Sequence, residues 1–132
     1  MGFSLAKCVL KFAGNVTQLT GPTSLDLSHE NFKIISVVTA DQMLNETLKH
    51  FENSDITIMS AAVSDYKPKA KLSYKIKKQN DEPLSLDLVQ NSDILKLLGN
   101  KKKKNQILIG FALETDNELQ NANNKIKSKN LD

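Results

Sequence analysis

The sequence predicts an α/β fold with a mostly parallel sheet, flanking helices and a β-hairpin flap. Segments with strand-like and helix-like patterns alternate along the chain, which is the order that βαβ units produce. The segments 55–63 and 106–113 are nearly continuous in apolar and β-branched residues, as strands buried on both faces are. The segments 71–78 and 84–90 alternate apolar with polar residues, which is typical of hairpin strands.

The predicted strands are short and end at turn residues. Those of the parallel sheet are expected at 15–20, 32–39, 55–63 and 106–113. The two hairpin strands are separated by "QNDEP", and together with their flanks they form a flap at about residues 68–90. This arrangement is Rossmann-like, and we expect residues 1–132 to form a single domain.

The predicted helices carry apolar residues at helical spacing. They are expected at 3–13, 39–53, 91–100 and 115–130. Thr39 and Thr115 are each followed three residues later by Gln or Glu, which predicts capping boxes at the second and fourth helices. Asn91 or Ser92 is expected to cap the third helix, which closes near Gly99.

Composition excludes several classes of protein. Net charge is +3 with seven Phe and Tyr residues, which argues against a nucleic-acid-binding surface. The single Cys8 excludes an internal disulfide and fits a reducing, cytoplasmic location. No segment approaches the roughly 20 apolar residues of a membrane span, so we expect no membrane partner. His29 and His50 lie far apart, and no residue is assigned to a metal.

Small residues and one carboxylate lie where two predicted strands end. Ala61, Ala62 and Asp65 follow one buried strand, and Gly110 and Phe111 end the other. Ligands of open parallel sheets bind outside the carboxyl ends of the strands. Small residues there let a flat ligand approach the backbone, although Asp65 is also an ordinary turn residue and Phe111 an ordinary core residue.

Positive charge is expected near the same end of the sheet. Lys75 lies on the flap, Lys125 and Lys129 share a helix face, and a helix begins at Asn91. A nucleoside triphosphate, with about four negative charges, would suit this arrangement if these groups converge on one cleft. The structural alternatives are solvated lysines, a plain helix cap and, for the run 101–104, a solvated loop.

Five segments, in this order, resemble one family over essentially the whole chain. They are "AAVSDYKP", "KIKK", "LVQNSDIL", "IGFALET" and "NANNKIKSKNLD". The family is the phosphopantothenoylcysteine synthetase, or phosphopantothenate–cysteine ligase, domain of the bacterial coenzyme A biosynthesis bifunctional flavoprotein. The resemblance implies condensation of 4′-phosphopantothenate with cysteine through an acyl-cytidylate, with CTP as substrate and Mg²⁺ assisting. It also implies a homodimer, and a decarboxylase domain in the full-length protein.

The resemblance assigns roles to particular residues. Lys75 opens "KIKK" on a flexible flap and contacts the triphosphate, which makes it the candidate catalytic residue. Asp65 faces the nucleotide and Phe111 borders the base. The candidate nucleotide-binding residues are Ala61, Ala62, Asp65, Lys75, Asn91, Ser92, Asp93, Ile94, Phe111, Lys125 and Lys129.

The sequence departs from the family pattern, and these differences limit the ligase activity that we expect of this chain. Ser92 stands where the family has proline, and Leu113 stands where it has alanine. The family carries a strand and a glycine-rich segment before the position of Met1, and another strand after Asp132. We therefore expect a truncated domain with little or no ligase activity alone, without FMN chemistry. Whether the nucleotide substrate is CTP or ATP stays open, since eukaryotic relatives use ATP.

Two other functions fit an α/β domain. An NAD(P)-binding Rossmann domain would need G-x-G-x-x-G after a strand, and "GNVTQLTGP" lacks that spacing. A non-enzymatic nucleic-acid-binding module would need a stronger basic surface with stacking aromatics. Comparing NADPH with CTP, and measuring salt-dependent oligonucleotide binding, would distinguish these alternatives.

Overall fold

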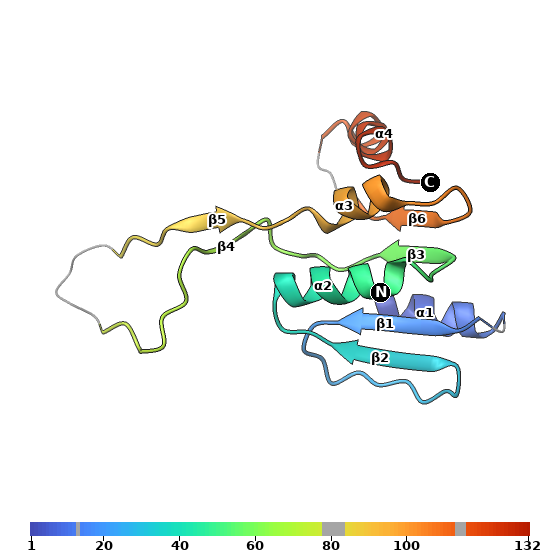
Figure 1. The fold of residues 1–132 in the computed structure, drawn as a ribbon, viewed down its shortest axis with the longest axis horizontal. Helices are drawn as coiled ribbons and strands as arrows, with labels where there is room; N and C mark the ends of the chain where they lie inside the picture. Colours follow the sequence, from blue (N-terminus) through green and yellow to red (C-terminus); the bar gives the residue numbers. More distant parts are fainter. Residues whose placement is uncertain (13, 78–83, 113–115) are drawn as a thin grey trace.

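The computed structural model describes residues 1–12, 14–77, 84–112 and 116–132. Figure 1 shows its helices and strands in chain order. They are α1 Gly2–Leu10, β1 Val16–Thr20, β2 Phe32–Ser36, α2 Ala40–Phe51, β3 Ile56–Met59, β4 Tyr66–Pro68, β5 Leu88–Gln90, α3 Ile94–Lys101, β6 Ile107–Gly110 and α4 Glu118–Lys129. Within the described ranges, no helix is long and apolar enough to cross a bilayer.

Two pairs of parallel strands confirm the predicted Rossmann-like α/β fold. β1 pairs with β2 from Val16↔Phe32 onward, and β3 pairs with β6 from Ile56↔Ile107 to Met59↔Gly110. The four arrows lie in the order β6, β3, β1 and β2 and point the same way (Figure 1). No ladder joins β1 to β3 in the described part of the chain, so each has one edge without a strand partner.

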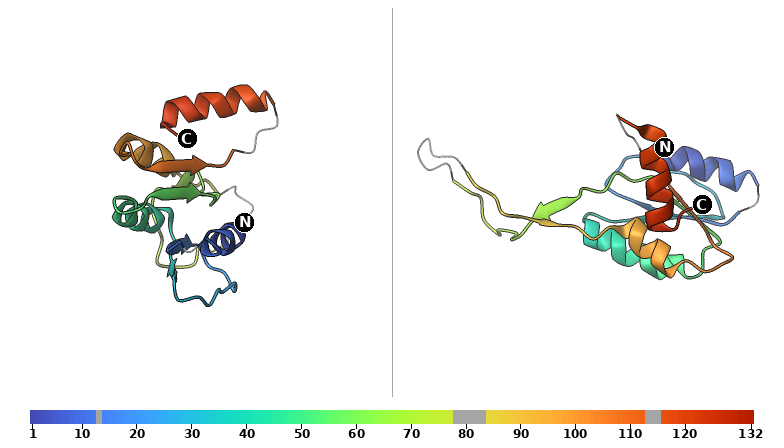
Figure 2. Two further views of the ribbon diagram at one scale, coloured as in Figure 1. Left: turned by 90° about the vertical axis from the view of Figure 1, so that its right-hand side faces the viewer. Right: turned by 90° about the horizontal axis from the view of Figure 1, so that it is seen from above.

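Helices α2 and α3 bury their apolar faces against one side of the strands, and α1 lies on the other side (Figure 2). In α2, Met43, Thr47 and Phe51 are buried at successive four-residue intervals, which place them on one helix face. Leu98 of α3 and Leu108 of β6 are fully buried at the centre of the core. The remaining buried members of that cluster are Val37, Met43, Phe51 and Ile94.

The helix boundaries are partly as predicted. Thr39 forms the expected capping box: its hydroxyl accepts from the Gln42 amide at 3.1 Å, and the Gln42 side chain accepts from the Thr39 amide at 3.1 Å. The cap of α3 is Asp93, whereas Asn91 and Ser92 were expected. That helix continues through Gly99 to Lys101. Thr115 lies outside the described residues, but the N-cap of α4 is Asn117, so the predicted box at Thr115 was wrong.

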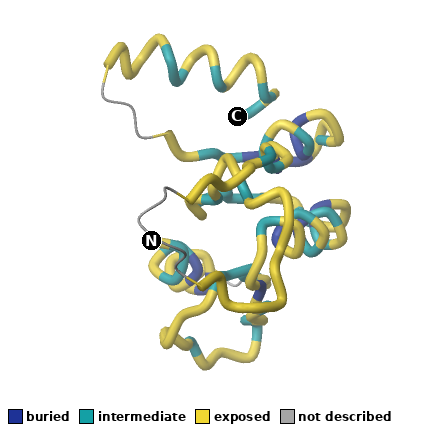
Figure 3. Tube along the Cα trace, turned by 90° about the vertical axis from the view of Figure 1, so that its left-hand side faces the viewer, coloured by how far each residue is buried: buried dark blue, intermediate teal, exposed yellow. Residues whose placement is uncertain are grey.

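The flap extends from the body as an arm, defined here as residues 66–77 and 84–90 (Figures 1 and 2). Its ladder joins β4 to β5, antiparallel, from Tyr66↔Gln90 to Pro68↔Leu88. The predicted strand 71–78 was wrong over residues 71–77, which are not in a strand, while residues 78–83 lie outside the description. Residues 71–77 are all exposed, and Figure 3 draws exposed residues in yellow, so no other part of the described chain covers the alternating side chains and alternation alone forms no ladder.

The lysine run 101–104 is only in part the solvated loop that was expected: Lys101, Lys103 and Lys104 are exposed, whereas Lys102 is largely buried. Lys101 ends α3, and the Lys102 side chain, only 10% exposed, forms an ion pair with Asp132 at 2.7 Å. The Lys103 amine donates to the carbonyl of Glu52 at 3.1 Å. Lys104 is exposed and has no hydrogen bond among the described residues. Two lysines of a charged run that is typical of a solvated loop therefore contact residues from distant segments of the chain.

Candidate functional site

The carboxyl ends of β3 and β6 lie side by side, as the sequence predicted for a ligand-binding edge. Met59 pairs with Gly110, so the residues that follow the two strands leave the sheet at the same end. Ala61 and Ala62 are exposed there. Phe111 is 50% exposed, which argues against the core role that an apolar residue in a strand would suggest. A ligand with a flat ring could therefore contact the exposed residues Ala61 and Ala62 and the half-exposed Phe111 at this edge.

Asn91 ties the start of α3 to the loop that contains Asp65. Its amide donates to the Asp65 carbonyl at 2.8 Å, and its side-chain Nδ2 donates to the Ser64 carbonyl at 2.8 Å. The remaining side-chain atom, Oδ1, is buried and has no partner among the described residues. A buried acceptor without a partner is costly, so this atom is suited to receive a donor from a ligand or a water molecule.

Asp93 performs two tasks at the first turn of α3. Its Oδ1 accepts from the Lys96 amide at 3.0 Å, which caps the helix, and its Oδ2 lies 2.9 Å from the Lys129 amine. Partial burial raises the pKa of the Asp93 carboxyl, but the hydrogen bonds from Lys129 and Lys96, with their positive charges, outweigh it and lower the pKa below its usual value. The carboxylate is therefore ionised at neutral pH.

The remaining candidate residues of α3 and α4 differ in how exposed their side chains are. Ser92 is exposed, whereas Ile94 is 5% exposed and belongs to the core, so its side chain is not available to a ligand. Lys125 is half-buried and lies one turn before Lys129 on α4. The structure thus brings Asp65 to Asn91 and Asp93 to Lys129.

Lys75 is not brought to these residues. It is exposed and belongs to the segment 71–77, which is part of the arm that extends away from the body (Figure 2). The expected convergence of all the lysines on one cleft is therefore incomplete in this conformation. For Lys75 to touch a ligand held at the ends of β3 and β6, the arm has to bend toward the body.

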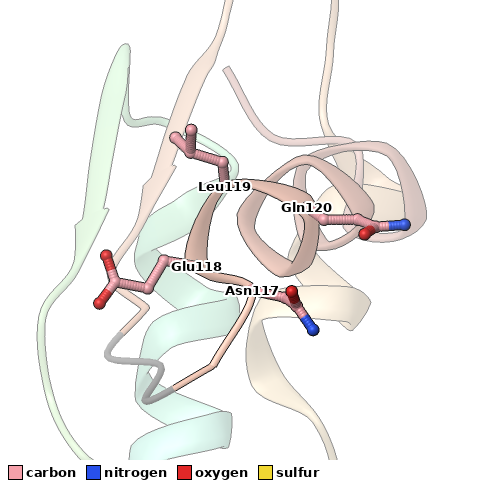
Figure 4. Close-up of a pocket in the computed structure, with 4 residues that line it drawn as sticks. All are labelled: Asn117, Glu118, Leu119 and Gln120. Atoms are coloured by element: carbon pink, nitrogen blue, oxygen red, sulfur yellow. The ribbon is translucent and has the colours of Figure 1, made fainter.

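Two depressions in the surface of the described residues lie away from the predicted residues. A shallow one of about 490 Å³ is lined by Asn117, Glu118, Leu119 and Gln120 at the start of α4 (Figure 4). Another, of about 280 Å³, lies between the last turns of α2 and α3; Phe51, Lys103 and Gln106 contribute to its wall. Neither contains a predicted nucleotide-binding residue.

A metal site made by protein side chains alone is not visible in the described ranges. No three His, Cys, Asp or Glu residues there cluster closely enough to hold an ion. Mg²⁺ commonly binds through one or two carboxylates together with substrate phosphates. The residues present fit that second arrangement, with Asp65, an exposed carboxylate at the strand ends, as the available protein ligand.

Sequence reasoning missed the residues that join α3 to α4. Gly99 packs so closely on Lys129 that a Cβ at Gly99 would lie 1.8 Å from the Lys129 carbonyl oxygen. Asn130 ends α4 in the left-handed conformation, at φ 52°, and its Nδ2 donates to the Gly99 carbonyl at 2.9 Å. A glycine inside a predicted helix was the available signal, because it commonly marks a close approach of another backbone.

Comparisons with known proteins agree with this geometry over the whole chain. The model of the DNA/pantothenate metabolism flavoprotein C-terminal domain family matches residues 1–132. The coenzyme A biosynthesis bifunctional protein CoaBC of Borreliella burgdorferi is 44% identical over 133 residues, covering all of this chain and 34% of that protein. The CoaBC of Bacillus subtilis is 42% identical, covering all of this chain and 32% of that protein.

A solved structure shows the same fold. The crystal structure of the C-terminal domain of a coenzyme A biosynthesis bifunctional protein CoaBC superimposes with a TM-score of 0.82 at 33% identity, covering 98% of this chain and 59% of that chain. The chain spans about a third of the length of the curated relatives that it matches. It belongs to the DNA/pantothenate metabolism flavoprotein C-terminal domain family.

Proposed function

We propose that the protein containing this chain is a CTP-dependent phosphopantothenate–cysteine ligase of coenzyme A biosynthesis. The observation that carries the proposal is the match of the whole chain to bifunctional coenzyme A biosynthesis proteins. Contacts among the candidate residues support it: Asn91 contacts the Asp65 loop, Asp93 contacts Lys129 and Phe111 is half exposed.

The proposed reaction has two balanced steps. The carboxylate oxygen of 4′-phosphopantothenate attacks the α-phosphorus of CTP, and pyrophosphate leaves. The amine of cysteine then attacks the acyl carbon, the acyl–oxygen bond breaks, CMP leaves and an amide forms. Lys125 and Lys129 stabilise phosphate charge, and Phe111 and the small residues 61–62 contact the base. Mg²⁺, bound with the triphosphate, neutralises further phosphate charge.

Nucleotide binding is the direct test of this proposal. With the natural protein and Mg²⁺ at saturating nucleotide, CTP is expected to raise the unfolding temperature, because a ligand at 100 times its Kd stabilises the folded state by about 2.7 kcal/mol. ATP at equal concentration tests the choice of base, and NADPH tests the alternative of a dinucleotide-binding domain. Thermal-shift fluorimetry measures all three.

The outcomes separate the alternatives. A shift with CTP, together with pyrophosphate release that requires phosphopantothenate, supports the ligase. A shift with NADPH and none with CTP or ATP would overturn the proposal. A larger shift with ATP than with CTP would keep the ligase and change its nucleotide.

We also propose that the arm mediates a homodimer. Seven of its apolar side chains are exposed, because nothing in the described part of the chain covers them: Tyr66, Leu72, Tyr74, Ile76, Leu84, Leu86 and Leu88. Exposed apolar residues gathered on one element commonly mark a protein interface. An arm from a second copy offers the same apolar residues and the open backbone edges of β4 and β5.

Substituting charges into the arm tests the dimer. Tyr74, 70% exposed, and Leu86, 59% exposed, are both changed to Glu in the natural protein; we expect the mass in solution to fall to that of the monomer. Leu119→Glu is the control, because Leu119 is 82% exposed on α4, outside the arm. Light scattering after size exclusion gives the masses. A dimer that survives the double change would exclude the arm as its interface.

A further inference from the structure

We infer that Asp93 is a positioning residue for Lys129, the lysine assigned above to the triphosphate. The inference rests on the proposed nucleotide-binding function, and it assigns to the Asp93 carboxylate a role other than contact with the nucleotide. Two independent contacts carry it: one fixes the backbone of Lys129, and the other fixes its amine.

The backbone of Lys129 is held against the middle of α3. An added Cβ at Gly99 would lie 1.8 Å from the Lys129 carbonyl oxygen and 2.8 Å from its carbonyl carbon, so the two backbones touch. The next residue, Asn130, leaves α4 at φ 52° and donates its Nδ2 to the Gly99 carbonyl at 2.9 Å. These contacts fix where the Lys129 side chain begins.

The amine of Lys129 is held at the first turn of α3. Its Nζ lies 2.9 Å from Asp93 Oδ2, and the Lys129 side chain is only 23% exposed. Asp93 is itself fixed, because its Oδ1 caps α3 through the Lys96 amide. The side chain of Lys129 therefore reaches from the Gly99 contact toward the start of the same helix.

Holding the amine in place prepares it for an anion. A free lysine side chain loses rotamer freedom when it binds, and a side chain that is ordered beforehand avoids that loss. A lysine amine has three N–H donors, and the pair with Asp93 Oδ2 uses one of them. The others are available to phosphate oxygens while the amine stays at the carboxylate.

A double-mutant cycle in the natural protein tests this role. The variants are Asp93→Asn, Lys129→Ala and both together, and the measurement is CTP affinity with Mg²⁺ by isothermal titration calorimetry. Asparagine caps helices as well as aspartate does, so Asp93→Asn removes the ion pair and retains the cap. Lys127→Ala is the matched control, because Lys127 lies in the same last turn of α4 and is exposed.

We expect Lys129→Ala to weaken CTP binding about tenfold or more and Asp93→Asn to weaken it about threefold. In the Lys129→Ala background, Asp93→Asn is expected to change nothing further, and Lys127→Ala should leave affinity as it is. Urea unfolding of each variant verifies that the fold is retained.

The results distinguish this inference from the proposed function. If Asp93→Asn weakens binding equally with and without Lys129, or does not weaken it at all, Asp93 does not position Lys129 and the nucleotide site stands. If the unaltered protein does not bind CTP, the proposed function fails, and this inference fails with it.

Discussion

Replacing Gly99 with alanine is expected to lower the free energy of unfolding by about 3 kcal/mol. The added Cβ would lie 1.8 Å from the carbonyl oxygen of Lys129. That oxygen belongs to the backbone, so it cannot rotate away as a side chain would, and α3 and α4 have to separate. Alanine is favoured over glycine inside a helix by about 1 kcal/mol, which is too little to offset the clash. Urea unfolding of the natural protein measures the difference.

Gly21→Ala is the matched control for this substitution. No atom lies within 4 Å of a Cβ built on Gly21, and Gly21 does not have a positive φ. A change within about 0.5 kcal/mol of the unaltered protein is expected there. If Gly99→Ala were as harmless as Gly21→Ala, the close contact between α3 and α4 would be wrong, and the placement of Lys129 would lose its support.

The parts of the fold that follow from local sequence were predictable. The positions of the strands and the capping box at Thr39 depend on residues within a few positions of each other, so their patterns survive in the sequence. Burial on both faces was not correctly predicted, because β3 and β6 are shorter than expected and only partly buried. The cap of α3 did not follow from pattern alone. Asn91, Ser92 and Asp93 are all good capping residues, and Asn91 is engaged instead by the carbonyls of Ser64 and Asp65.

Long-range contacts account for the other errors. Lys102 was predicted to be solvated because its partner, Asp132, lies 30 positions away. Lys103 is exposed as predicted, but its hydrogen bond to the carbonyl of Glu52, 51 positions away, could not be predicted. The alternation at 71–77 predicts a strand with one covered face, but the arm has no second layer to cover it. A pattern of apolar residues therefore predicts that one face of a strand is to be covered. It does not predict whether this chain provides the residues that cover that face.

The candidate site was predicted in part for the same reason. The rule that ligands bind at the carboxyl ends of parallel strands placed Ala61 and Phe111 correctly at one edge, because that rule depends only on strand order. The contact between Asp93 and Lys129 joins two helices, so the spacing of residues could not predict it. The position of Lys75 depends on how the arm bends, which the local pattern does not determine.

Lys75→Ala is expected to weaken CTP binding about tenfold to a hundredfold, because a hydrogen bond to a charged group contributes about 1.5–3 kcal/mol. Lys75 is exposed and has no hydrogen bond or ion pair among the described residues, so its removal should leave the free energy of unfolding unchanged. The loss would thus report contact with the nucleotide and bending of the arm toward the body. Calorimetric titration of the natural protein with CTP and Mg²⁺ measures the affinity.

The control for Lys75 has to be another lysine whose loss changes net charge and nothing else. The sequence suggests Lys102, but its amine pairs with Asp132 and its side chain is largely buried, so Lys102→Ala would also disturb the fold. Lys104 meets the requirement, because it is exposed and without a hydrogen bond in the described part of the chain. Equal weakening by Lys75→Ala and Lys104→Ala would show that the arm lysine acts only through net charge, because a hydrogen bond from Lys75 to the nucleotide would be lost in only one of the two variants.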